Sequence, residues 1–170
     1  MPLTLPELNA LDKAAFTAEL GHIFEHSPWV AERTHAHRPF PDFLTLHTLL
    51  CATMRAASRE EQLALIQAHP DLAGKLAQLK RLTAVSAREQ ASAGLDALSV
   101  KELAEFERFN SAYAARFGFP FIICARHHDR ESIMEAMRTR VFNTHAEEHD
   151  NTLAEIEKIA WLRLKDVLPD

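Results

Sequence analysis

The sequence is short of glycine, cysteine and concentrated charge, and each shortage excludes a class of protein. Only 4 of its 170 residues are Gly and only 2 are Cys, at Cys51 and Cys124. The chain therefore has neither a glycine-rich phosphate loop nor a disulfide scaffold. No apolar stretch approaches the roughly 20 residues that span a bilayer. The first residues also lack the basic and then apolar pattern of a signal peptide. We expect a cytoplasmic protein that binds no membrane.

The charge balance argues against nucleic acid as a partner. Lys and Arg number 19 and Asp and Glu number 24, which gives a formal net charge of −5 and a pI of about 6.0. Domains that bind nucleic acid usually carry a basic patch or stripe, and the basic residues of this chain are scattered. The expected partner is a small molecule or another protein.

The pattern of apolar residues is helical along most of the chain. Hydrophobic residues make up 47% of the sequence and charged residues 25%, which is typical of a globular protein. We predict an all-α, single-domain multi-helix bundle over residues 1–170, built from about nine helices. The expected helices are 12–24, 28–37, 42–57, 59–68, 71–81, 86–95, 100–117, 130–142 and 145–167.

Helix starts are marked by sequences that fit the capping box, in which a Ser or Thr and a Glu three residues later satisfy each other's backbone amides. The four candidates are Ser58 with Glu61, Ser86 with Glu89, Ser99 with Glu102, and Thr144 with Glu147.

One segment breaks the helical pattern, in the sequence RFGFPFIICAR. Gly118 can end the preceding helix, and Pro120 prevents its immediate resumption. We predict a short extended segment near 118–126. Its exposed amides and carbonyls need partners, which either the protein or a ligand must supply.

The sequence HPDLAGK follows a predicted helix directly. Pro70 cannot donate a helical hydrogen bond and pushes His69 toward extended backbone angles. We therefore expect the helix to stop before His69, whose imidazole would be presented from a stiff backbone. An imidazole titrates near neutral pH and can act as a general acid or base.

Glu89 has two interpretations. It can be the reciprocal half of a capping box with Ser86 and need no further role. Alternatively, the helix start SAREQ can direct first-turn amides and a carboxylate toward a polar ligand.

Two other function classes remain open at this stage. The sequence HAEEH fits the H-x-x-E-H pattern, so His145, Glu148 and His149 make a candidate metal-dependent hydrolase site. A catalytic zinc site needs a third protein ligand. Beyond His149, the only candidates are carboxylates of the same helix. We therefore favour a solvated helix face and expect no metal. The second alternative is a non-catalytic helical interaction module whose partner surface is the apolar stripe of helix 145–167.

Three motifs in order resemble one known family. They are HPDLAGK at 69–75, SAREQASAGL at 86–95 and FNSAYAARFGFPFIICAR at 109–126, with RPF at 38–40 as a weaker fourth. Together they are similar to the 2-oxo-4-hydroxy-4-carboxy-5-ureidoimidazoline (OHCU) decarboxylases of urate degradation. The resemblance implies an all-α homodimer and a cofactor-free decarboxylation that yields (S)-allantoin. A related decarboxylase acting on another cyclic ureide is a close alternative.

The resemblance also implies roles for individual residues. His69 falls on the family's catalytic histidine and Glu89 on the glutamate of its Ser-x-x-Glu-Gln motif. Arg126 closes the third motif and is a candidate anchor for the substrate carboxylate. The residues that the resemblance assigns to substrate binding are Pro70, Ser86, Ala87, Arg88, Glu89, Gln90, Phe121, Ile122, Ile123, Cys124, Ala125 and Arg126.

Overall fold

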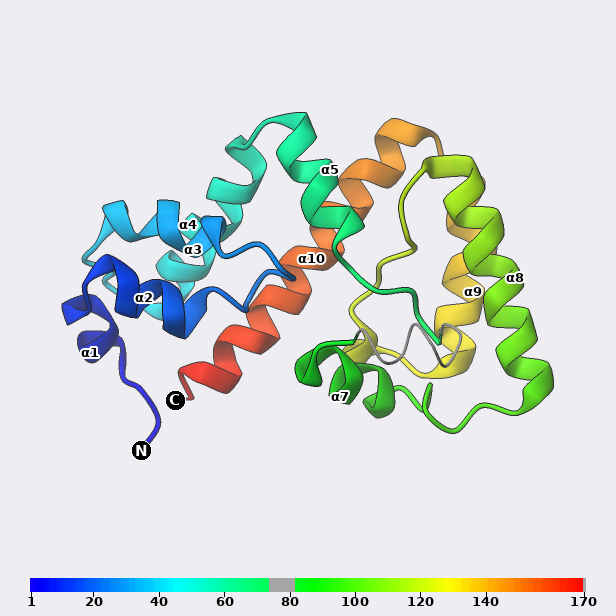
Figure 1. The fold of residues 1–170 in the computed structure, drawn as a ribbon, viewed down its shortest axis with the longest axis horizontal. Helices are drawn as coiled ribbons and strands as arrows, with labels where there is room; N and C mark the ends of the chain where they lie inside the picture. Colours follow the sequence, from blue (N-terminus) through cyan, green and yellow to red (C-terminus); the bar gives the residue numbers. More distant parts are fainter. Residues whose placement is uncertain (74–81, 170) are drawn as a thin grey trace. The chain divides into compact units, whose positions relative to one another are not determined.

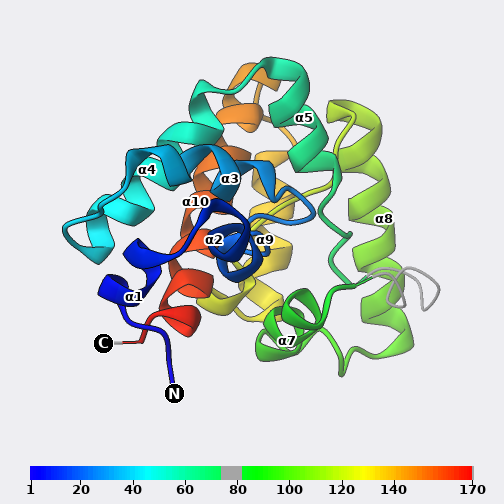
Figure 2. The same ribbon diagram turned by 60° about the vertical axis from the view of Figure 1, so that its left-hand side comes forward.

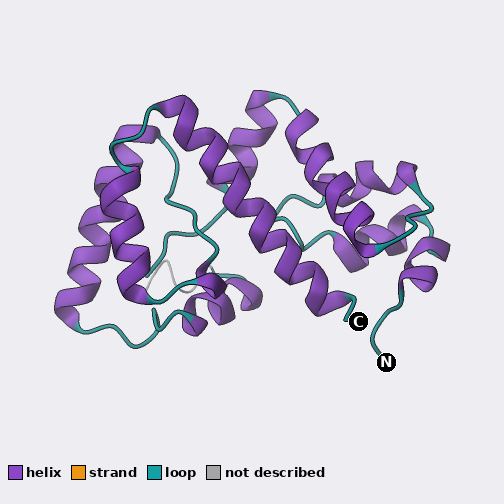
Figure 3. Cartoon of the chain, turned by 180° about the vertical axis from the view of Figure 1, so that it is seen from behind, coloured by secondary structure: helices purple, strands orange, loops and turns teal. Residues whose placement is uncertain are grey.

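The computed structural model describes residues 1–73 and 82–169, and these residues are mostly helical (Figure 1). The α-helices are α1 (Leu5–Ala10), α2 (Lys13–Leu20), α3 (Trp29–Thr34), α4 (Phe43–Ala56), α5 (Arg59–Gln67), α7 (Ala84–Ser92), α8 (Val100–Phe117), α9 (Arg130–Arg140) and α10 (His145–Val167). Two short 3-10 helices, η1 (His35–His37) and η2 (Ala125–His127), complete the elements. No strand occurs in the described residues, and Figure 3 shows only helices and loops. The all-α prediction is confirmed.

The long helices begin and end close to where the sequence predicts. α8 and α10 have the predicted bounds, and α4 and α5 lie within one residue of theirs. Ser58 and Ser99 cap α5 and α8 in the capping boxes expected with Glu61 and Glu102. Of the predicted helix 71–81, residues 71–73 are not helical and 74–81 lie outside the described residues.

Several other bounds were wrong. α2 ends at Leu20, α9 ends at Arg140, and the predicted helix 28–37 is α3 followed by the 3-10 helix η1. α1 was not predicted, although Thr4 and Glu7 form a capping box at its start. The helices were predicted from the period of their apolar residues, and a helix of only 6 residues is too short to show that period.

Contacts divide the described chain into two compact units. Unit 1 contains Met1–Ala68 and the part of α10 from Glu157 onward, and unit 2 contains the described residues between His69 and Ile156. The single domain expected over 1–170 stays a prediction.

Unit 1 is built from the first helices and the end of the last one. α3 packs against both α2 and α4 (Figure 2). The rings of Phe16 and Phe40 stack with centroids 5.9 Å apart. A buried ion pair joins Arg163 to Glu25 at 2.9 Å. Because each buried charge has a partner, neither bears an uncompensated desolvation cost.

Unit 2 contains the region that the sequence singled out. α8 and α9 lie side by side (Figures 1 and 3), and α7 packs against η2. An aromatic cluster fills the space beside α8, with the Tyr113 ring 4.6 Å from Phe117 and 5.2 Å from Phe121 between centroids. The Tyr113–Phe121 contact is edge-to-face and joins the loop after α8 to the helix.

The apolar stripe of α10 is core and not an exposed surface. Of its predicted members, Leu153, Ile156, Ile159, Ala160 and Leu164 are buried and Val167 is half-buried. This burial removes the surface on which the interaction-module alternative depended. Among the described residues, no helix is both long and apolar enough to cross a membrane.

Candidate active site

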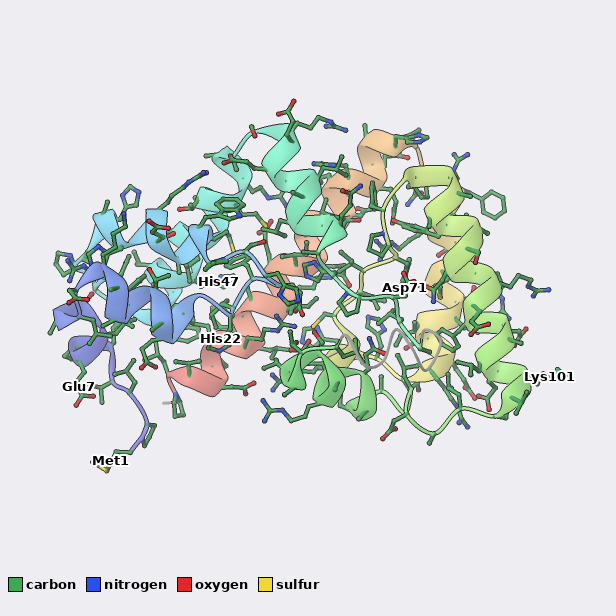
Figure 4. All side chains as sticks on the ribbon, in the orientation of Figure 1. Met1, Glu7, His22, His47, Asp71 and Lys101 are labelled. Carbon is green, nitrogen blue, oxygen red and sulfur yellow. The ribbon has the colours of Figure 1, made fainter. Side chains whose placement is uncertain are left out.

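All predicted site residues lie in unit 2, on three separate pieces of chain. These are the turn after α5, helix α7, and the loop between α8 and α9 that ends in η2. Asp71, in the first of these pieces, is labelled in Figure 4.

The first piece follows the end of α5. α5 ends at Gln67, and its C-terminal cap Ala68 still has helical angles (φ −72°, ψ −16°). Residues 69–71 are then non-helical, as the His-Pro pair predicted. His69 is buried, with 9% of its surface exposed. Its burial fits a group that acts in an enclosed site and not on the surface.

The backbone that follows His69 is fixed to α7 and α8 by two amide side chains. Gln90 donates from Nε2 to the Asp71 carbonyl at 3.2 Å and accepts from the Ala73 N–H at 3.1 Å. Asn110 donates to the Leu72 carbonyl at 2.7 Å. Ala73 is in the left-handed region (φ 49°), which L residues adopt at a cost. Gln90 and Asn110 therefore hold a turn that would not keep this shape alone.

The second piece, α7, presents the predicted residues on two faces. Ser86, Glu89 and Gln90 are buried and follow the i, i+3, i+4 spacing of one helix face. Ala87 and Arg88 are exposed. The structure thus brings the Ser-x-x-Glu-Gln residues together and places the two intervening residues on the outside.

The capping box predicted for Ser86 and Glu89 is wrong. The N-cap of α7 is Thr83, whose side chain accepts a hydrogen bond from the Ser86 amide at 3.1 Å. Ser86 and Glu89 therefore lie within the helix, where amides are used by the helical hydrogen bonds; the Ala87 N–H already donates to the Thr83 carbonyl at 2.9 Å. Glu89 therefore has no capping role, and capping does not explain its presence in the helix. Glu89 is a buried carboxylate within a helix, and such groups need a specific reason to be there.

The third piece begins where Gly118 ends α8 in the left-handed conformation (φ 77°), as predicted. Residues 120–124 then form no regular element. Two side chains from outside the segment bind its backbone. Arg140 donates from Nη1 to the Ile122 carbonyl at 2.7 Å, and Glu155 accepts from the Cys124 amide at 3.3 Å.

The predicted extended segment is shorter than 118–126. Ala125 and Arg126 belong to η2, because the His127 and His128 amides fold back to the Cys124 and Ala125 carbonyls at 3.0 Å each. Residues 121–125 are all buried, whereas Arg126 is exposed.

The second and third pieces are close in space. α7 packs against η2. Burial raises the pKa of the Cys124 thiol to about 11, with further contributions from the Glu155 and Glu89 carboxylates. The buried side of α7 that carries Glu89 is therefore electrostatically coupled to the loop that contains Cys124. With Gln90 binding the turn after His69, α7 is the element that connects the other two pieces.

The candidate metal site at His145, Glu148 and His149 is not supported. Glu148 is fully buried and accepts hydrogen bonds from Tyr113, Arg140, Asn143 and Asn151 at 2.6 to 3.1 Å. His145 is exposed, and within the described chain no group of three His, Cys, Asp or Glu residues could hold a metal ion.

Unit 1 contains a pocket of its own. It has a volume of about 370 Å³, and its lining residues are Arg33, His37, Leu49, Ala52, Thr53, Ala56 and Ala57. None of them is a predicted site residue. Its charged member Arg33 is already paired with Glu61, so the pocket offers no free cation to a ligand.

Four residues that bind the site segments were not predicted. They are Asn110, Tyr113, Arg140 and Glu155, which lie on α8, α9 and α10. Asn110 and Tyr113 lie inside the motif at 109–126, but local sequence assigns none of the four its contact, because each acts on backbone or on a side chain at least 8 positions away.

Comparison with known proteins identifies a family. The sequence model of the OHCU decarboxylase family matches residues 9–165. A 2-oxo-4-hydroxy-4-carboxy-5-ureidoimidazoline decarboxylase of Haloferax volcanii is 42% identical over 96% of this chain and 95% of its own. The uric acid degradation bifunctional protein PucL of Bacillus subtilis is 40% identical over 98% of this chain, which spans only 33% of that longer protein.

A solved structure supports the same relationship. A crystal structure of (S)-allantoin synthase superposes with a TM-score of 0.79 at 28% identity, and the match covers 98% of this chain and 54% of that one. This chain therefore corresponds to about half of the solved protein.

Proposed function

The chain belongs to the OHCU decarboxylase family, and on that premise we propose that it decarboxylates OHCU to (S)-allantoin with His69 as the proton donor. As a member of this family, the chain is a carboxy-lyase of urate degradation. The roles of individual residues follow from chemistry and from the contacts within unit 2.

The reaction needs an acceptor for electrons and a donor for one proton. The bond between the ring carbon and the carboxylate breaks and carbon dioxide leaves. The electron pair moves into the conjugated carbon–nitrogen system of the ring and gives an enolate-like species. A proton then adds to the ring carbon that bears the ureido group, which becomes the stereocentre of allantoin. The substrate ring accepts the electron pair itself, so no cofactor is called for.

His69 supplies the proton in this proposal. An imidazolium can donate near neutral pH and regain its proton from solvent. A donor held in one place protonates one face of the ring, whereas solvent protonates both. The contacts of Gln90 and Asn110 to residues 71–73 support this role, because they fix the backbone two residues beyond His69.

The other predicted residues, apart from the exposed Ala87 and Arg88, bind and orient the substrate. Ser86 and Glu89 lie on the buried face of α7 beside Gln90, where the Glu89 carboxylate can accept hydrogen bonds from the ureido N–H groups. The main chain of residues 121–125 offers neutral donors and acceptors to the ring. Pro70 shapes the wall beside His69, and Arg126 attracts the substrate carboxylate from the edge.

The observation that carries this proposal is the pair of Gln90 hydrogen bonds, which join the His69 turn to the helix of Glu89. The test generates OHCU from urate in place and follows allantoin by circular dichroism. Wild-type protein should speed the decay and yield one enantiomer, and His69→Ala should abolish both effects while remaining folded.

Matched controls separate this function from its rivals. His145→Ala removes an exposed imidazole of the same unit and should leave turnover unchanged, as should a metal chelator. Glu89→Gln should weaken substrate handling, seen as a raised KM. Near-normal turnover by His69→Ala would remove that residue from the mechanism. Decay of OHCU unaffected by wild-type protein would favour another cyclic ureide as substrate.

We also propose that the protein works in the cytoplasm as a homodimer, as members of this family are expected to do. Sedimentation equilibrium at the assay concentration tests the dimer, and a mass of one chain would refute it.

A further inference from the structure

The loop between α8 and η2 has no neighbouring strand in the described residues, so its backbone must be held by side chains. Such a segment is costly to bury unless its amides and carbonyls have partners. Two partners come from helices that follow it in sequence: Arg140 of α9 binds the Ile122 carbonyl, and Glu155 of α10 binds the Cys124 amide.

Arg140 makes three different contacts at once. Its Nε donates to Glu148 Oε1 at 2.6 Å, its Nη1 donates to the Ile122 carbonyl at 2.7 Å, and its guanidinium carbon lies 4.3 Å from the centre of the Phe121 ring. A planar guanidinium can satisfy this combination because its donors diverge in one plane while its face stacks on a ring. An ammonium group has no such plane.

Glu148 fixes the position of Arg140. Its side chain is fully buried, and it also accepts from the Tyr113 hydroxyl at 2.6 Å and from Asn143 Nδ2 at 3.0 Å. A carboxylate held from several directions cannot turn to follow its partner. The hydrogen bonds therefore run in an unbroken path from Tyr113 of α8, through Glu148 and Arg140, to the backbone at Ile122.

These contacts determine which backbone groups of the loop stay open. The Ile122 carbonyl and the Cys124 amide are used by Arg140 and Glu155, and the Cys124 carbonyl accepts from His127. By contrast, the N–H and C=O of Ile123 have no hydrogen-bond partner within residues 1–73 and 82–169. Ile123 is buried. A buried donor and acceptor on one residue match the adjacent N–H and C=O of a ureide ring.

We propose that Arg140 is a positioning residue of the active site, which fixes Ile122 so that the N–H and C=O of Ile123 are presented to the substrate ring. Arg140 itself touches no substrate and acts through the loop backbone. The inference rests on the proposed function, because it assigns the ligand of residues 121–125 to the OHCU ring.

Arg140→Lys tests the inference most sharply. Lysine keeps the positive charge that pairs with Glu148 but loses the second donor arm and the planar face. We expect KM for OHCU to rise at least fivefold in the folded variant. The pH profile of kcat should stay unchanged, because Arg140 donates no proton in the reaction.

Two control variants lie on the same helix. Arg138→Lys makes the same chemical change at a half-exposed ion pair with Glu135, and its KM should equal that of wild type. Ile133→Val removes one methyl group from a fully buried side chain of α9 and leaves the hydrogen bonds of Arg140 in place. A purely structural role would make Arg140→Lys resemble Ile133→Val, in which the folded fraction falls and KM is unchanged.

Each outcome distinguishes a positioning role of Arg140 from a purely structural one. A folded Arg140→Lys protein with KM within twofold of wild type overturns the inference and leaves the proposed function intact. If Arg140→Lys does not fold, Tyr113→Phe replaces it as the test. That change removes one hydrogen bond to Glu148 and keeps the shape of the aromatic ring. An unchanged KM in Tyr113→Phe overturns the inference as well. Wild-type protein that fails to speed OHCU decay would refute the function, and with it this role for Arg140.

Discussion

Replacing Gln90 with Met tests whether α7 holds the His69 turn. Met has nearly the volume of Gln and opens no large cavity, but it removes both hydrogen bonds to the turn. Each hydrogen bond contributes about 1 kcal/mol net to stability. The Ala73 N–H, on a residue only 1% exposed, would also be left without its partner, at a cost of about 1–3 kcal/mol. The bond to the Asp71 carbonyl accounts for about 1 kcal/mol, and the cost of the unpartnered Ala73 N–H replaces that of its own bond with about 1–3 kcal/mol, so the expected loss is about 2–4 kcal/mol in the free energy of unfolding.

Urea denaturation measures this loss as a shift of the midpoint at constant m-value. Catalysis should suffer more than stability predicts, because a released turn no longer holds His69 in place. At temperatures where Gln90→Met is fully folded, we expect kcat/KM for OHCU to fall at least tenfold, and the enantiomeric purity of the allantoin to fall with it.

Gln62→Met provides a matched control in unit 1. Gln62 also makes two side-chain hydrogen bonds, to the Met54 and Arg55 carbonyls at 3.2 and 2.9 Å. Its loss should lower stability with no effect on kinetics. If Gln90→Met lost stability but kept wild-type kinetics, the turn would not need α7 to place His69. If it lost no stability, the two hydrogen bonds would be absent in solution.

Two further predictions concern titratable groups of unit 2. Burial raises the pKa of Glu148, but the hydrogen bonds from Asn143 and Tyr113 and the charge of Arg140 outweigh this effect and leave its pKa below the usual 4.5. The unfolded chain therefore binds the proton at higher pH, so the contribution of Glu148 to stability is complete above pH 4.5 and is lost as pH falls below it. In a plot of the free energy of unfolding against pH, Glu148→Gln should make the fall in stability on the acid side less steep. An unchanged slope there would refute the assignment. At pH 8, a Cys124 thiol with a pKa of about 11 is deprotonated in about one molecule in a thousand, so mass spectrometry should find it unalkylated by iodoacetamide in the native protein and alkylated after denaturation.

The fold was predictable where one local rule governs a stretch. α8 and α10 have the predicted bounds because the predicted capping boxes, Ser99 with Glu102 and Thr144 with Glu147, start them and an apolar period continues through each helix. The break at Gly118 was predictable because a left-handed C-terminal cap favours glycine. α7 shows the limit of such rules. Both Thr83 and Ser86 are acceptable caps, and the sequence does not say which one begins the helix.

The site was predictable only as separate motifs. The His-Pro pair, the Ser-x-x-Glu-Gln run and the loop after Gly118 each stand out in the sequence, but the contacts that join them do not. Gln90 reaches back 17 and 19 residues, and Asn110 reaches back 38. Contacts over such separations depend on how helices pack, and no local pattern of residues encodes that packing.

Glu148 shows that the role of a residue in a short motif depends on the side chains around it. Within HAEEH it reads as the acidic member of a metal site, flanked by two histidines at helical spacing. In the structure its oxygens are engaged by Tyr113 and Arg140 among others, and these partners connect it to the backbone of Ile122. A carboxylate with that many donors cannot also bind a cation without giving up the contacts that make its burial tolerable. A glutamate in an H-x-x-E-H sequence can therefore be a structural residue and not a metal ligand. Here Glu148 supports the loop of residues 121–125, because Tyr113 of α8 and Arg140 of α9 are its hydrogen-bond partners.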